Sequence, residues 1–117
     1  MTVVTALTRG LDAKPFRCDV ARDGDDVRIT LEGELDLATS PQVEAVLREP
    51  CDHGVARRVL DLSGLTFMDS SGLRVVLVAD AAGRRDGPAL VVVKGPPSVQ
   101  NVFEITGVLG GLRFVAS

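Results

Sequence analysis

The chain has 117 residues, of which 45% are hydrophobic and 25% are charged, with 13 basic and 16 acidic side chains and a formal net charge of -3. This length suits one domain with one core and is too short for two. The slight acidic excess argues against a direct nucleic-acid partner, which needs a basic surface, and the 3% of aromatic residues argue against stacking platforms for single strands.

The first predicted element is a β-hairpin. Residues 1–15 show no clear period and end at Pro15, so they are expected to form an N-terminal leader to a domain over residues 16–117. Segments Phe16–Ala21 and Asp26–Gly33 flank the turn sequence RDGD, and apolar residues alternate with polar ones along the second segment. This pattern predicts two paired strands with one buried face.

After the hairpin, helix and strand patterns alternate. The pair Ser40-Pro41 is typical of a helix start, and Pro50 stops the segment. The apolar segments Val55–Leu62 and Leu90–Val93 are typical of strands, and the solid apolar character of the second suits a strand that is covered on both faces.

The segment Ser71–Ala82 is ambiguous, because its β-branched residues favour a strand by propensity. Its length, the serine at its start and Gly83 at its end favour a helix, which we predict. A further helix is expected between a cap at Ser98 and a stop at Gly107, with a last short strand over Leu112–Val115. The order β-β-α-β-α-β-α-β predicts a single α/β domain with a mostly parallel mixed sheet, an antiparallel edge hairpin and packed helices.

Composition gives no indication of a cofactor, a metal site or a membrane span. Cys18 and Cys51 are far apart in sequence and His53 is the only histidine, so the usual residues provide no four-ligand zinc site. One disulfide is possible, but buried thiols in a reducing compartment are the preferred interpretation. No apolar run approaches the roughly 18 residues of a membrane span, and no secretory signal is recognisable, so we predict a cytoplasmic protein.

Four small polar or flexible residues, Asp69, Ser70, Ser71 and Gly72, lie at the predicted entry to the central helix. Outward N–H groups and the positive end of the helix dipole favour an anion there, so a hydroxyl is well placed to carry a phosphate. The simplest alternative is that one serine caps the helix while Asp69 offsets the dipole. No catalytic residue is predicted, because the G-x-S-x-G elbow and the GxxxxGK[ST] loop are absent and His53 is the only possible base.

The segment LDLSGLTFMDSSGLRVV, Leu60–Val76, resembles the signature of STAS domains, in particular of bacterial anti-sigma factor antagonists of the SpoIIAA and RsbV kind. LEGELDLAT (residues 31–39) and VFEITGV (residues 102–108) are similar to two further segments of that family. The resemblance extends from about Phe16 to Val115 and implies the STAS fold.

The resemblance also implies a regulated binding protein. In the family the first serine after the aspartate is phosphorylated, which corresponds to Ser70 in this sequence. The unmodified domain binds an anti-sigma factor that is itself a serine kinase and so releases a sigma factor; phosphorylation ends the complex, and a PP2C-type phosphatase resets it. Asp36 is implied to lie near Ser70 at the partner-binding rim with Asp69, Ser71 and Gly72, although a solvated loop acid or a second helix cap is equally compatible with Asp36.

A STAS domain can also be a scaffold subunit, for example in a signalling or lipid-transport complex, where the serine need not be modified. The presence of both Ser70 and Ser71 favours the switch, because a purely structural domain has no need for a free hydroxyl there.

Overall fold

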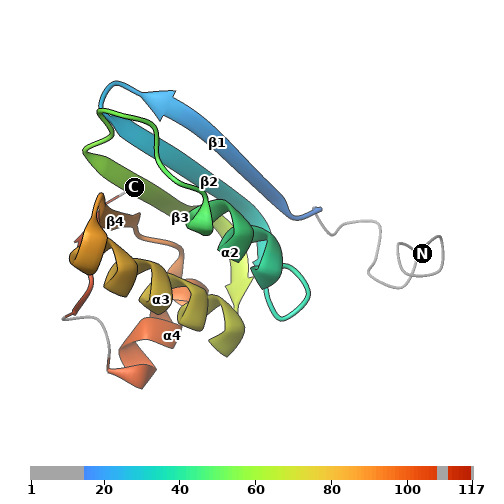
Figure 1. Ribbon diagram of the computed structural model, residues 1–117. Helices are drawn as coiled ribbons and strands as arrows, with labels where there is room; N and C mark the ends of the chain where they lie inside the picture. The colour runs from blue at the N-terminus through green and yellow to red at the C-terminus, as the bar shows by residue number, and fades with distance from the viewer. Residues whose placement is uncertain (1–14, 108–110, 117) are drawn as a thin grey trace.

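The computed structural model describes residues 15–107 and 111–116, drawn as a coloured ribbon in Figure 1. All but Pro15 of the predicted leader lies outside these ranges, so the boundary between leader and domain stays a prediction. Strands and helices follow one another in the predicted order. In chain order the elements are β1 (Arg17–Asp23), β2 (Asp26–Leu35), α2 (Ser40–Arg48), β3 (Arg57–Met68), α3 (Ser70–Asp86), β4 (Ala89–Val93), α4 (Pro97–Thr106) and β5 (Phe114–Val115).

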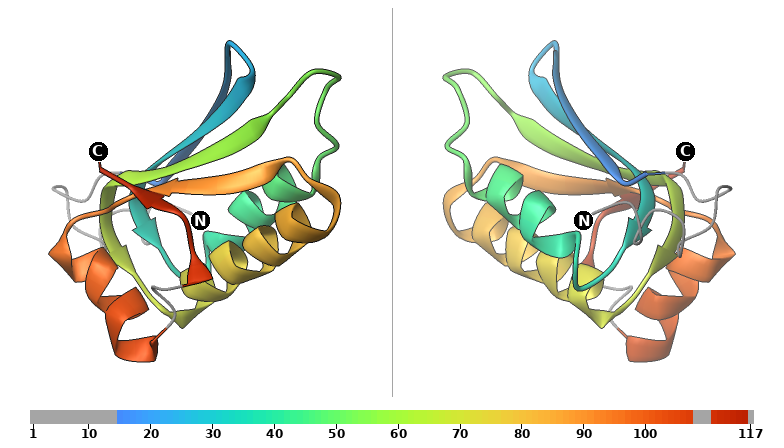
Figure 2. Two further views of the ribbon diagram at one scale, coloured as in Figure 1. Left: turned by 90° about the vertical axis from the view of Figure 1, so that its left-hand side faces the viewer. Right: turned by 90° about the vertical axis from the view of Figure 1, so that its right-hand side faces the viewer.

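The strands form one mixed sheet in the order β1-β2-β3-β4-β5. Strands β1 and β2 are antiparallel and meet at a two-residue turn, where Gly24 has a φ of +61°. The remaining neighbours are parallel, so each is reached through a crossover helix. The views in Figure 2 show α2 and α3 side by side along the same side of the sheet. The predicted fold class and the edge hairpin are therefore confirmed.

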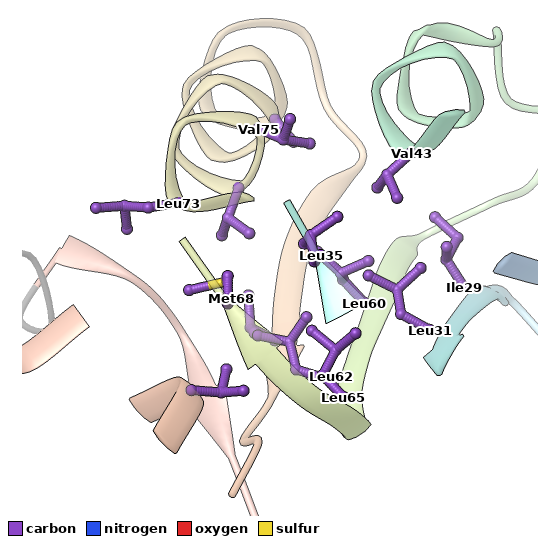
Figure 3. Close-up of a cluster of buried hydrophobic side chains, with 14 of the residues drawn as sticks. Ile29, Leu31, Leu35, Val43, Leu60, Leu62, Leu65, Met68, Leu73 and Val75 are labelled. Carbon is purple, nitrogen blue, oxygen red and sulfur yellow. The ribbon is translucent and has the colours of Figure 1, made fainter. Parts of the chain in front are cut away.

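The core lies between this face of the sheet and the helices. Ile29 and Leu31 alternate with more exposed residues along β2, which confirms the predicted buried face for this strand of the hairpin. In β1, by contrast, all residues except Cys18 are exposed. Figure 3 shows buried side chains of β2 and β3 beneath Val43 of α2 and Val75 of α3. Helix α4 is held by Phe103, which is fully buried and packs edge-on against Phe114 of β5, with ring centroids 5.1 Å apart.

Helix α3 is longer than predicted. Gly83, which we expected to end it, lies inside the helix. A Cβ atom at Gly83 would be 2.9 Å from the carbonyl oxygen of Pro88, so the glycine allows the chain to return closely past the helix into β4. The helix ends instead at Gly87, whose φ of +60° favours glycine.

Strand β3 also extends past its predicted end at Leu62 and reaches Met68. Its second half pairs with the end of β2, with register shifts along the way. Gly64 is needed there, because a Cβ atom would be 2.7 Å from the carbonyl oxygen of Leu31. As a result, β2 and β3 end side by side. At the other end of the chain, β5 is shorter than the predicted strand over Leu112–Val115.

Ser40 and Ser98, which mark the predicted starts of two helices, are not the N-caps of those helices. Thr39 occupies the N-cap position of α2, and Ser40 is the first helical residue, with a buried hydroxyl that has no hydrogen-bond partner among the described residues. Pro96 is the N-cap of α4, while the Ser98 hydroxyl donates to the carbonyl of Thr66 at 3.2 Å. Ser98 therefore ties the start of α4 to β3.

Asp61 is a buried acid on the face of β3 opposite the core side chains, with 7% of its surface exposed. Its carboxylate accepts hydrogen bonds from the Ser63 backbone N–H (2.9 Å) and hydroxyl (2.6 Å) and from Arg28 of β2 (2.7 Å). Burial on its own would raise the pKa of Asp61, but these hydrogen bonds and the Arg28 charge together hold that pKa below its usual value. The ionised carboxylate thus links the two central strands.

Candidate functional site

The candidate site lies where β2 and β3 end side by side. Leu35 and Met68, the last residues of these strands, are paired, and the Asp69 backbone N–H donates to the Leu35 carbonyl at 3.2 Å. Neighbouring strands lie about 4.8 Å apart. The backbones of Asp36 and Asp69, which follow these residues, therefore leave the same edge of the sheet next to each other.

Asp69 is the N-cap of α3. Its backbone is extended, and its Oδ1 atom accepts hydrogen bonds from the backbone N–H groups of Ser71 (2.8 Å) and Gly72 (3.4 Å). The Asp69 carbonyl accepts the first helical bond, from the Leu73 N–H at 3.1 Å. The cap is thus the aspartate, and the alternative in which one of the serines caps the helix is wrong.

Because Asp69 provides the cap, the serine hydroxyls are not needed for it. Ser70 is the first residue of α3 and is exposed, whereas Ser71 is half-buried. Within residues 15–107 and 111–116, the Ser70 hydroxyl makes no hydrogen bond. The arrangement places a free hydroxyl at a helix N-terminus, where an added anion is electrostatically favoured.

Gly72 is buried and fixes the position of the first turn of α3. A Cβ atom there would be 2.6 Å from Cγ of Met68 and 2.8 Å from Cγ of Leu35. The close neighbours are side chains of the strand ends. Because Gly72 is buried, it can contribute to partner binding only by positioning the helix that carries Ser70.

The Asp36 side chain stabilises the loop that leads into α2. Its Oδ1 atom accepts hydrogen bonds from the backbone N–H groups of Ala38 (3.0 Å) and Thr39 (3.1 Å) and from the Thr39 hydroxyl (3.2 Å). Its carbonyl accepts from the Ser40 N–H at 2.8 Å. These contacts make Asp36 a loop acid that orders the turn before α2, whose N-cap is Thr39, and they leave its second carboxylate oxygen outside the loop bonds.

Leu37, which the sequence did not single out, follows Asp36 in this loop and is 77% exposed. A large apolar side chain that is this exposed can supply contact area to a protein partner. The sequence offered one signal for Leu37: it is an apolar residue that follows the end of the alternating apolar and polar residues of β2 at Leu35. We call Asp36, Leu37, Asp69 and Ser70 together the switch surface.

Replacing Asp69 by alanine is expected to lower the free energy of unfolding by about 0.5–2 kcal/mol, because two N–H groups of α3 lose their acceptor. Asp69→Asn should lose less, since an amide oxygen can still cap. Urea denaturation of both variants measures the difference, with Asp52→Ala as a control for an exposed acid. Equal losses for the alanine and asparagine variants would contradict the capping role.

No helix among the described residues has both the length and the apolar character needed to cross a membrane. The same residues contain no cluster of three or more His, Cys, Asp or Glu side chains arranged to hold a metal ion. The candidate site is thus built from a helix terminus, two acids, a hydroxyl and an exposed leucine.

The chain is similar to proteins of a known family. A family model described as "Mlab, STAS domain" matches residues 18–115. Over 79 residues the chain is 42% identical to BtrV of Bordetella bronchiseptica, whose name describes it as a candidate anti-sigma factor antagonist, with 68% of each chain covered. It is 37% identical over 84 residues to the anti-sigma F factor antagonist of Paenibacillus polymyxa, again with 68% of each covered.

Solved structures show the same fold. An anti-sigma factor antagonist from Mycobacterium paratuberculosis superposes with a TM-score of 0.74 at 20% identity, covering 86% of this chain and 85% of that one. Unphosphorylated SpoIIAA gives a TM-score of 0.68 at 23% identity, with 88% of each chain covered. SpoIIAA of Bacillus in its phosphorylated form gives 0.63 at 23% identity, covering 88% of this chain and 91% of that one.

Proposed function

This chain belongs to the STAS domain family, and we propose that it is an anti-sigma factor antagonist whose binding is switched off by phosphorylation of Ser70. The observation that carries the proposal is the exposed Ser70 hydroxyl at the start of α3, beside a cap that Asp69 already provides. Relatives that are 42% and 37% identical bear names for this activity, which supports the same assignment here.

In this proposal the unmodified switch surface binds an anti-sigma factor. The exposed side chain of Leu37 supplies apolar contact area, and the acids beside it favour a partner with basic groups. An anti-sigma factor held in this complex is not available to its sigma factor, which is therefore released by mass action. The domain itself performs no chemistry.

Phosphorylation and dephosphorylation of Ser70 set the switch. The bound anti-sigma factor is also a serine kinase, which transfers the γ-phosphoryl group of ATP to the Ser70 hydroxyl, and a PP2C-type phosphatase later removes it. Ser70 is favoured over Ser71 because it is exposed, whereas Ser71 is half-buried and its backbone N–H is bonded to Asp69.

Incubation with a cognate anti-sigma kinase and ATP is expected to place one phosphate on the peptide that contains Ser70, as located by mass spectrometry. Ser70→Ala should remain unlabelled and stay bound to the kinase, because the acceptor hydroxyl is absent while the surface keeps its shape. Ser71→Ala is the matched control and should still be labelled. Phosphate on Ser71 of the natural sequence, or undiminished label in Ser70→Ala, would show that the assignment is wrong.

A further inference from the structure

Strand β1 forms an outer edge of the sheet, as Figure 1 shows, and among the described strands it pairs only with β2. Apart from Cys18, every residue of β1 is exposed, and Val20 retains 53% of its surface. An edge of this length presents a row of unpaired backbone groups to any other strand. We propose that β1 pairs antiparallel with β1 of a second copy of this chain, which joins the two sheets across a two-fold axis.

The turn of the hairpin determines which backbone groups face outward. In a two-residue turn the carbonyl of the first flanking residue accepts from the N–H of the second, so Asp23 and Asp26 form a hydrogen-bonded pair. Hydrogen-bonded residues alternate along an antiparallel strand. The backbone groups of Arg22, Val20 and Cys18 therefore point away from β2 and are available to a second strand.

The symmetry of a dimer restricts how two such strands can pair. Rotation about a two-fold axis perpendicular to the sheet maps each face of the sheet onto itself. Two residues that lie opposite each other across the axis must therefore have side chains on the same face. Centring the axis on Val20 places the two Val20 residues opposite each other and each Cys18 opposite Arg22 of the other copy. All of these residues have outward backbone groups, so this register completes the hydrogen-bond ladder.

The charges on β1 select this register. With Val20 on the axis, Arg17 of each copy lies opposite Asp23 of the other copy, which gives two cross-strand ion pairs, and Asp19 lies opposite the small residue Ala21. Moving the axis to Asp19 places the two Asp19 carboxylates opposite each other. Moving it to Ala21 places Asp19 opposite Asp23. Like charges directly opposite are unfavourable, so of these three registers only the one centred on Val20 brings opposite charges together along RCDVARD. An axis on Cys18 would also place Arg17 opposite Asp19, but it would pair only three residues of β1, whereas the axis on Val20 pairs all seven.

Both faces of the strand support the pairing. Arg17 and Asp19 already form an exposed ion pair at 3.1 Å, so Arg17 is on the face where it would meet Asp23 of the second copy. On the helix-covered face, Val20 borders an apolar hollow of about 230 Å³ that is also lined by Val27, Ile29 and Val46. Contact between the two Val20 side chains would cover apolar surface at this edge.

An interface made from two short strands is small, so a weak dimer that depends on concentration is expected. Strand β2 separates β1 from β3 and the start of α3, so pairing through β1 leaves Ser70 accessible. The inference therefore does not depend on the proposed function, and each can fail without the other.

The first experiment uses charge reversal and sedimentation velocity over a concentration series reaching the millimolar range. Arg17→Asp and Asp23→Arg should each weaken self-association about tenfold or more, because two attractive pairs become repulsive. An equimolar mixture of the two variants should associate as well as the natural protein, since both cross-strand pairs are then complementary. A natural protein that stays monomeric throughout, or a mixture that associates no better than its components, would overturn the proposal.

The second experiment tests the register by cross-linking in a Cys18→Ser, Cys51→Ser background. Two residues in a hydrogen-bonded pair have Cα atoms about 5.5 Å apart, within the range of a disulfide, so Val20→Cys should give a covalent dimer under mild oxidation. In the matched control Ala21→Cys the two thiols belong to residues more than about 7 Å apart and should not be linked. Equal cross-linking of both variants would contradict this register.

Discussion

Phosphorylation of Ser70 is expected to weaken binding to the anti-sigma factor by more than about a hundredfold. A phosphoserine adds about -1.5 to -2 charge at neutral pH. In the structure this charge would lie beside the Asp69 carboxylate and near the end of β2 that carries Asp36. Like charges brought together in a desolvated interface are unfavourable by several kcal/mol, which accounts for a loss of this size.

The fold itself should respond little to the phosphate. A negative charge is favourably placed at the N-terminus of α3, and Ser70 is exposed, so no packed side chain has to move. Amide exchange should therefore change only around residues 66–76, while affinity measured by calorimetry falls steeply. Widespread loss of protection across the sheet would indicate a conformational switch instead. Unchanged affinity would favour the scaffold interpretation, in which the serine is not regulatory.

Local signals were sufficient to predict the order of elements. The hairpin follows from alternation after a glycine-containing turn, and the start of α3 follows from an aspartate and serines before an apolar run. The stretch from Asp69 to Gly72 was singled out for the same reason, because a cap and a helix terminus are defined within a few residues. The choice of Ser70 within it came from the resemblance to the family and stays a prediction. Such features are determined by residues that are close in sequence, so a prediction from sequence can reach them.

Features that depend on distant segments could not be predicted in this way. Gly83 resembles a helix stop in sequence, but its role is to let the chain pass closely at Pro88. Similarly, Gly64 resembles a turn residue, yet β3 continues through it because β2 is close enough to pair. In both cases a tertiary contact outweighs the local preference of glycine.

Asp36 shows why the site was only partly predictable. The sequence left a loop acid, a helix cap and a partner contact as alternatives. The structure shows its carboxylate bonded to the loop before α2, a role that depends on the loop geometry. It also shows that Asp36 and Asp69 leave paired strand ends, which requires the register of β2 against β3. A partner contact through the remaining oxygen stays a proposal.

Two leucines that are two positions apart are expected to respond to alanine substitution in opposite ways. Leu35 is fully buried beneath Gly72 and pairs with Met68, so Leu35→Ala leaves a cavity under the start of α3. The free energy of unfolding should fall by about 2–5 kcal/mol. Leu37 is 77% exposed, and Leu37→Ala should change stability by no more than about 0.5 kcal/mol.

Partner binding should show the reverse order. Leu37→Ala removes an exposed apolar side chain from the switch surface, and affinity for the anti-sigma factor should fall about tenfold with the fold intact. Leu35→Ala should bind normally under conditions where it remains folded, because its side chain does not reach the surface; Leu35→Val provides a milder cavity if the alanine variant does not fold. Urea denaturation and calorimetric titration of the same samples separate the two effects. Similar losses of stability in both variants, or unchanged affinity in Leu37→Ala, would remove Leu37 from the switch surface and leave partner binding to the acids and Ser70.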